Sequence, residues 1–257
     1  MTLAAPVVTR LEKAAMDNGF DLGGMPDSDW LAFASSQSAL RVWLTAPPEA
    51  GLAAAFSQLN VARALAEYGA PAAGPLPSGA VAARGVPDMP ALHRLLRRAF
   101  QLSRTLPDEL LHAFARKAAS LPRTTEAERL MVQRVGQDIF RAGLMEYWEA
   151  RCAITGLDVA PLLRASHIKP WADCAGDAER LDVFNGLLLA PHLDAAFDGG
   201  FVSVADDGTV LLSPVLSESA GALLGLDRPL RVAALADGHR IYLPWHRSAV
   251  FRSSIEL

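Results

Sequence analysis

The sequence predicts an α+β fold with helices in its middle third and short strands toward its C-terminus. Alanine and leucine are abundant and aromatic residues make up only 7% of the 257 residues, which favours helices over an all-β fold. Apolar side chains recur at helical spacing through residues 91–150, whereas after Arg151 short strand-like runs alternate with turns. Apolar residues make up 51% and charged residues 20%, values typical of a folded globular protein.

Composition also excludes several classes of protein. The chain contains only two cysteines, so we exclude a disulfide-dense secreted scaffold. The N-terminus lacks a basic segment before its short apolar run, and no apolar stretch reaches the ~18 residues that a membrane span needs. The net charge of −4 gives no global signal for nucleic acid. We therefore expect a soluble cytoplasmic protein with no membrane partner.

The first 90 residues predict a small N-terminal α/β module. We expect a helix over 5–18, a strand over 40–45 and a helix over 51–68. Residues 69–90 then hold 4 glycines and 5 prolines without a period, which predicts a linker or extended loop. No motif in residues 1–90 carries chemistry.

Residues 91–151 predict a basic helical connector inside an acidic protein. The segment carries 11 basic and 7 acidic side chains, a net charge of +4. Such regional asymmetry points weakly to a polyanionic partner, and solvated helix faces are the simpler explanation. The expected helices span residues 91–101, 107–120 and 125–150.

Residues 152–257 predict a small strand-rich domain with one helix in its centre. A strand is expected in LLRASHI, a tight turn at Asn185-Gly186, a helix from about Pro191 and a hairpin on Asp207-Gly208. Two further strands are expected near residues 230–235 and 240–243.

Two side chains in this domain suit phosphodiester hydrolysis. That reaction needs a base to deprotonate water and a cation to stabilise charge on the phosphate and the leaving oxygen. His167 can accept a proton at cellular pH, and Asp194 is a hard oxygen ligand for Mg²⁺ or Mn²⁺. We expect the imidazole and the carboxylate to meet across one bound ion.

Four blocks of sequence, in order, resemble the HNH nucleases, also called ββα-metal nucleases, and within them the restriction-type subgroup. The resemblance runs from about Thr124 to Arg252, roughly half the chain. The blocks are ERLMVQRVGQDIF, YWEARCAITG, LLRASHIKPW and RLDVFNGLLLAPHLDAAFDGGFVSV. The resemblance implies that residues 152–257 form a C-terminal ββα-metal nuclease domain.

The family pattern implies a role for individual residues. The general base falls on His167, Asn185 braces the loop that positions this base, and the last metal position falls on Asp194, where the family name implies histidine. Many family members place Asp or His directly before the base, but this chain has Ser166, a weaker ligand. His192 and Asp198 are further candidates as ligands or orienting groups.

The resemblance implies a metal-dependent DNA endonuclease that restricts foreign, in some cases modified, DNA. Residues 1–90 and the basic helices are then the candidates for recognising a DNA sequence or modification. Mg²⁺ or Mn²⁺ is the expected cofactor, although another divalent ion would also serve, and a homodimer would suit double-strand cuts. Arg164 and Lys169 flank His167 and could meet phosphates, or they could be ordinary surface charges.

Two alternative functions stay open at this point. The first is a DNA-binding or regulatory protein with a degenerate, inactive HNH domain, for which Ser166 and Asp194 are the relevant departures. The second is a secreted nuclease toxin, which the absence of a signal segment weakens.

Overall fold

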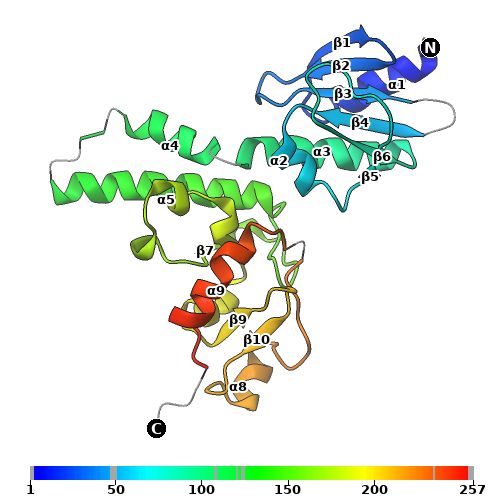
Figure 1. The fold of residues 1–257 in the computed structure, drawn as a ribbon. Helices are drawn as coiled ribbons and strands as arrows, with labels where there is room; N and C mark the ends of the chain where they lie inside the picture. Colours follow the sequence, from blue (N-terminus) through cyan, green and yellow to red (C-terminus); the bar gives the residue numbers. More distant parts are fainter. Residues whose placement is uncertain are drawn as a thin grey trace. The chain divides into compact units, whose positions relative to one another are not determined.

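The computed structural model is mixed α/β, consistent with the α+β prediction (Figure 1). The chain forms two compact units, residues 1–106 and 107–257. None of the helices in the described part of the chain has the length and apolar run that crossing a membrane requires. The structure describes residues 3–46, 51–106, 109–119, 121–122, 125–233 and 235–253.

The first unit is an antiparallel sheet with helices on one face. Its strands lie in the order β1-β2-β3-β4-β6-β5. The strands are β1 (Leu22–Asp27), β2 (Trp30–Ala34), β3 (Val42–Thr45), β4 (Leu52–Phe56), β5 (Ala70–Pro71) and β6 (Ala82–Val86). The helices are α1 (Ala5–Met16), α2 (Leu59–Ala64) and α3 (Met89–Thr105). Because α3 packs on α1 and on the sheet, the first helix of the expected connector belongs to this unit.

The prediction of a linker or extended loop over residues 69–90 is wrong where this segment forms the strands β5 and β6. β6 pairs with β4 along its whole length, and β5 adds the edge strand. A row of small side chains and one indole crosses the sheet in register on one face: Ala32, Trp43, Ala55 and Ala83. Ala72 and Ala80 of the Pro/Gly-rich segment pack over this row. The segment is therefore ordered because it covers apolar surface.

The prediction of one helix over residues 51–68 is also wrong. Residues 52–56 form β4, and only residues 59–64 form a helix, α2. The alanine run favours a helix locally, but β4 lies between β3 and β6, where small side chains let Trp43 pack across the sheet. The strand predicted at 40–45 is confirmed as β3.

The second unit is built around a two-stranded antiparallel ribbon of β7 (Arg164–His167) and β8 (Gly186–Leu189). Helix α5 (Glu126–Tyr147) packs against both strands, and α7 (Pro191–Asp198) packs against β7. A capping box of Thr125 and Glu128 starts α5, in agreement with the helix predicted over 125–150. The other elements are α4 (Glu109–Ala118), α6 (Asp177–Arg180), β9 (Val202–Val204), β10 (Val210–Leu212), α8 (Glu218–Leu223) and α9 (His239–Ala249). The start of the helix predicted over 107–120 lies outside the described residues.

The Asn185-Gly186 pair does not form the expected tight turn. Asn185 ends a short 3₁₀ helix, and Gly186 has an extended backbone with φ −151°. Glycine is required there for another reason: a Cβ atom would lie 2.5 Å from the Phe140 ring and 2.7 Å from Leu144. The glycine thus lets α5 approach the start of β8 closely.

The strand predicted near residues 240–243 is a helix instead, because these residues lie within α9. The buried side chains of α9 are His239, Tyr242, Leu243 and His246, which have helical spacing. A run as short as residues 240–243 does not distinguish a strand from a helix by its periodicity. Near residues 230–235, the structure has an isolated bridge between Thr209 and Arg231. The hairpin predicted at Asp207-Gly208 is confirmed by β9 and β10.

Candidate active site

Two carboxylates and one hydroxyl group meet between β7 and α7. Asp194 and Asp198 lie one helical turn apart on α7, and the buried Ser166 hydroxyl of β7 donates a hydrogen bond of 3.1 Å to Asp198 Oδ1. Burial raises the pKa of Asp194 above its ordinary value, and the neighbouring charge of Asp198 raises it further. Burial likewise raises the pKa of Asp198. The site therefore concentrates negative charge that an added cation would offset.

His167 ends β7 and has one ring nitrogen bound and one free of described partners. Its Nε2 lies 2.9 Å from the carbonyl oxygen of Arg180, and because a carbonyl only accepts, Nε2 must carry the hydrogen. Burial lowers the pKa of His167 below its ordinary value, so the ring is neutral near pH 7. Nδ1 is then the lone-pair nitrogen, and none of the described residues hydrogen-bonds to it.

The imidazole and the carboxylates lie on opposite faces of the ribbon. Ser166 and His167 are consecutive in a strand, so their side chains point to opposite sides. Ser166 contacts Asp198 of α7, whereas the His167 ring stacks on Phe140 of α5 with 3.8 Å between ring centroids. The expectation that His167 and Asp194 face each other directly across one ion therefore does not match this arrangement. The proton acceptor and the carboxylates come together only at the end of β7, where Ser166 and His167 are adjacent.

Asn185 is fully buried and closes the loop between the two strands. Its Oδ1 accepts from the Lys169 backbone N–H at 2.8 Å, and its Nδ2 donates to the carbonyls of Lys169 at 3.1 Å and Glu179 at 3.0 Å. The same amide nitrogen lies 3.4 Å from the sulfur of Cys174. One side chain thus connects Lys169, after β7, with Cys174 and with α6, the helix that presents the Arg180 carbonyl.

The remaining candidates differ in their surroundings. Arg164 shares the α7 face of the strand with Ser166, and its charge lowers the pKa of Asp194. The Lys169 ammonium pairs with Glu179 at 2.7 Å, which raises the pKa of Lys169. His192 is exposed, is rotated about 200° around α7 from Asp194, and contacts neither carboxylate among the described interactions.

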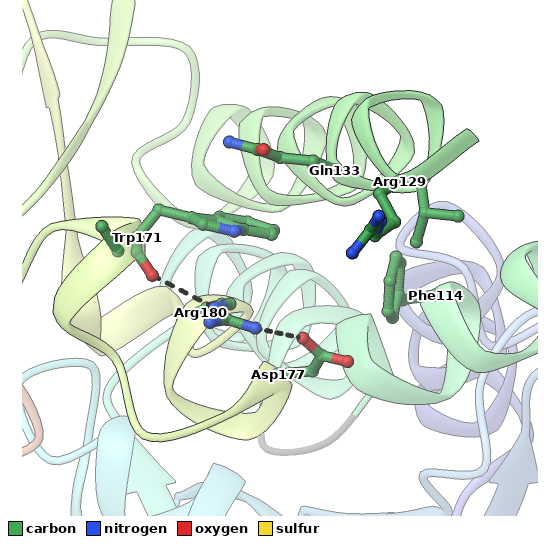
Figure 2. Close-up of a pocket in the computed structure, with 8 residues that line it drawn as sticks. Phe114, Arg129, Gln133, Trp171, Asp177 and Arg180 are labelled. Atoms are coloured by element: carbon green, nitrogen blue, oxygen red, sulfur yellow. Dashed lines mark hydrogen bonds and ion pairs between the residues drawn. The ribbon is translucent and has the colours of Figure 1, made fainter. Parts of the chain in front are cut away.

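Phe140, Trp171 and Arg180 surround His167, and the sequence did not indicate them as site residues. Trp171 meets the imidazole edge-on at 5.7 Å between ring centroids. The Arg180 Nε donates to the Trp171 carbonyl at 3.1 Å, as the dashed line in Figure 2 shows. Phe140 and Trp171 each lie in a block of sequence that resembles the HNH nucleases, and this resemblance is the one signal that could have indicated them as site residues. Arg180 begins another of these blocks, but it binds the imidazole through its backbone carbonyl, so its side-chain type gave no indication of this role.

Comparison with known proteins identifies this part of the chain. Residues 152–205 match the family model HNH_2, described as HNH endonuclease. This segment belongs to the HNH family. The match covers both ribbon strands, α7 and the loop that Asn185 closes. HNH nucleases in general use divalent metals, and a nuclease domain implies a DNA substrate. A search of curated proteins gives no match.

The oxygen donors of this HNH segment fit a hard divalent cation. No group of three or more His, Cys, Asp or Glu side chains suited to a metal occurs in the described part of the chain. Mg²⁺, however, is commonly held by one or two carboxylates, with water and substrate phosphate completing its shell. Asp194 and Asp198 supply two carboxylates, and Ser166 supplies a neutral oxygen that bonds to the pair. The cysteines are free and buried, and Cys152 accepts backbone N–H groups in a turn against β8.

Proposed function

We propose that the protein is a metal-dependent DNA endonuclease that hydrolyses phosphodiester bonds. The observation that carries this proposal is the pair of repelling carboxylates, Asp194 and Asp198, bridged by Ser166 within the segment that matches the HNH endonucleases. The chemistry that Mg²⁺ or Mn²⁺ supplies when bound is stabilisation of negative charge on the scissile phosphate and on the leaving oxygen.

His167 is the proposed proton acceptor. Its neutral ring carries the hydrogen on Nε2, which leaves the Nδ1 lone pair to take a proton from water. The carbonyl of Arg180 stabilises the ring once it is charged, since that hydrogen bond raises the pKa of His167 against the effect of burial. A phosphodiester lying across the shared end of β7 would meet Nδ1 from one side and the carboxylates from the other.

Asn185 and Arg164 are proposed to support this chemistry. Asn185 holds the loop whose backbone orients His167, so it acts by positioning. Arg164 is exposed beside the carboxylates and could contact a phosphate oxygen next to the scissile one. Lys169 also stays a candidate phosphate contact, which would require its ammonium to leave Glu179.

The biological role is proposed to be restriction of foreign DNA, including modified DNA. Contacts to the phosphate backbone do not read sequence, so recognition must come from other surfaces. The first 90 residues remain our candidate for recognition of DNA or its modification. A homodimer that would allow double-strand cuts stays a prediction.

A second candidate function is a DNA-binding or regulatory protein with an inactive HNH domain. The observations that favour it are Ser166, a weak ligand, and the placement of the imidazole on the face opposite Asp194. Under this reading the domain would bind DNA and leave it intact.

Incubation with plasmid DNA distinguishes the two functions. We expect purified protein to nick or linearise plasmid in Mg²⁺ or Mn²⁺ and to stop when EDTA is added. Asp194→Asn should abolish that activity, while Asp237→Asn, an exposed carboxylate elsewhere in the second unit, should keep it. Binding to plasmid without cleavage in any divalent ion would overturn the endonuclease and favour the regulator.

A further inference from the structure

A pocket of the second unit lies next to His167 and takes no part in the chemistry proposed above. Its volume is about 610 Å³, and it is lined by residues of α4, α5, α6 and the segment that leads into α6. Figure 2 shows Trp171 on one side of the pocket and Phe114 on the other, with the Arg129 side chain projecting from α5 beside Phe114. The walls are thus aromatic, while the groups between them are polar.

The polar groups of the pocket have unused hydrogen-bonding capacity. Arg129 is exposed, and its described hydrogen bond is a long one, 3.5 Å from Nε to the Thr125 carbonyl. Gln133 is half-buried, and none of the described residues hydrogen-bonds to its amide. Asp177 is paired with Arg180 at 3.0 Å, so its charge is neutralised. Among the described residues that line the pocket, an anionic ligand would therefore meet a guanidinium without an ion pair and no unpaired carboxylate.

Trp171 connects the pocket to His167. On one side the indole packs on α5 at Gly136, where a Cβ atom would lie only 2.5 Å from Cη2. The Arg180 guanidinium lies 5.5 Å from the ring centroid, and the His167 ring meets the indole edge-on. A group held against Trp171 is consequently separated from His167, the proposed proton acceptor, by the indole ring alone.

We propose that this pocket binds one nucleotide of the DNA strand that the enzyme cleaves, with its base unstacked between Trp171 and Phe114. The volume lies within the range of small-molecule sites, and aromatic walls hold bases of any identity. Arg129 binds the phosphate of that nucleotide, and the Gln133 amide offers both a donor and an acceptor to the base edge. This inference rests on the proposed function and names the part of the substrate that the second unit binds.

Photochemical cross-linking tests the position of the base directly. The full chain is mixed in EDTA with a single-stranded oligonucleotide carrying 5-iododeoxyuridine, irradiated, digested and mapped by mass spectrometry. We expect cross-links on the peptides that contain Trp171 or Phe114, because this photochemistry favours aromatic rings that touch the base. Cross-links confined to other peptides would overturn the proposal.

Binding measurements test the phosphate contact with a matched pair of variants. Arg129→Gln should weaken oligonucleotide binding about 5- to 10-fold and lower the slope of log affinity against log salt by about 0.7, the value for one phosphate contact on a single strand. Arg134→Gln removes the same charge from an exposed residue of α5 outside the pocket and should change both quantities less. Equal effects of the two variants would mean that only the general charge of α5 matters, and would contradict a specific contact.

The source of the nucleotide is tested by competition. An unlabelled single strand should displace the probe, and free deoxynucleoside monophosphates should displace it only at far higher concentration. If free nucleotides bind and strands do not, the pocket takes a soluble ligand and the proposal is wrong. Cleavage by a protein whose cross-links avoid the pocket would refute this inference alone, whereas pocket cross-links in a protein that never cleaves would refute the proposed function alone.

Discussion

The two faces of the β7–β8 ribbon share a backbone but differ in chemistry. Toward α7 the ribbon presents a hydroxyl and a guanidinium to two carboxylates, Asp194 and Asp198. Toward α5 it presents an imidazole to two aromatic rings, Phe140 and Trp171. Burial raises carboxylate pKa values on the first face and lowers the imidazole pKa on the second. In both cases the environment disfavours the charged form, but only the carboxylate face requires a counter-ion.

This difference teaches that a ligand set and a proton acceptor need not share one cavity. Each face can be packed for its own task, since consecutive strand residues serve opposite sides. If the two faces separate the two tasks, a substitution on one face should leave the task of the other face unchanged.

Removing the imidazole should have the largest effect. His167→Ala is expected to lower the cleavage rate about 10²- to 10⁴-fold, the range for loss of a general base. Mg²⁺ binding, measured by calorimetry, should stay within a few-fold of wild type because the carboxylates lie on the other face. Cleavage that survives the substitution, or metal binding that disappears with it, would contradict the assignment of proton transfer to one face and metal binding to the other.

Removing a carboxylate should act first on metal binding. Asp194→Asn should weaken Mg²⁺ binding by more than about 100-fold, since even partners of metal ligands cost about 10- to 100-fold when lost. Without metal the variant should melt at a higher temperature than wild type, because the repulsion with Asp198 is relieved. Thermal melts with EDTA and with Mg²⁺ give both results. A variant that keeps the Mg²⁺ shift would remove Asp194 from the ligand set.

Gly186 should control the packing of the aromatic face. Gly186→Ala places a Cβ atom 2.5 Å from Phe140, so we expect a loss of about 1–3 kcal/mol in the free energy of unfolding. Gly176→Ala is the matched control, because no atom lies within 4 Å of the added Cβ there. Equal stability of the two variants in urea denaturation would contradict the close approach of α5.

The aromatic packing on α5 should also make stability depend on pH. His239 is buried against Tyr147 and Trp148, and burial lowers its pKa to about 4. The unfolded chain takes up the proton near pH 6.5 and the folded chain does not, so stability is full above pH 6.5 and falls as pH drops toward 4. Between pH 7 and pH 5 this group should contribute a loss of about 2 kcal/mol. His239→Gln should reduce the fall in the free energy of unfolding, and an unchanged pH profile would contradict burial of a neutral ring.

The smallest effect is expected at His192. His192→Ala should leave cleavage and Mg²⁺ binding within about twofold of wild type, because the side chain is exposed and points away from Asp194. A loss comparable to that of Asp194→Asn would place an imidazole in the ligand set and blur the contrast between the two faces.

The sequence predicted what depends on neighbours in the chain. The helix start predicted at residue 125 is confirmed, where Thr125 and Glu128 form a capping box, and the helix start at Pro191 is also confirmed. Strand β4 was missed because its alanines favour a helix locally and become a strand only between β3 and β6. The stack of Phe140 on His167 joins residues far apart in sequence, and no local pattern encodes it.

The four-residue register of β7 has a consequence for how the domain tolerates length changes. Arg164, Ala165, Ser166 and His167 pair in order with Leu189, Leu188, Leu187 and Gly186. Inserting or deleting one residue within β7 would rotate every side chain on the affected part of the strand to the opposite side. The imidazole would then face α7 with its carboxylates, and the hydroxyl would face α5 with Phe140. Natural variation in chain length should therefore accumulate in the connection between the two strands and not within β7.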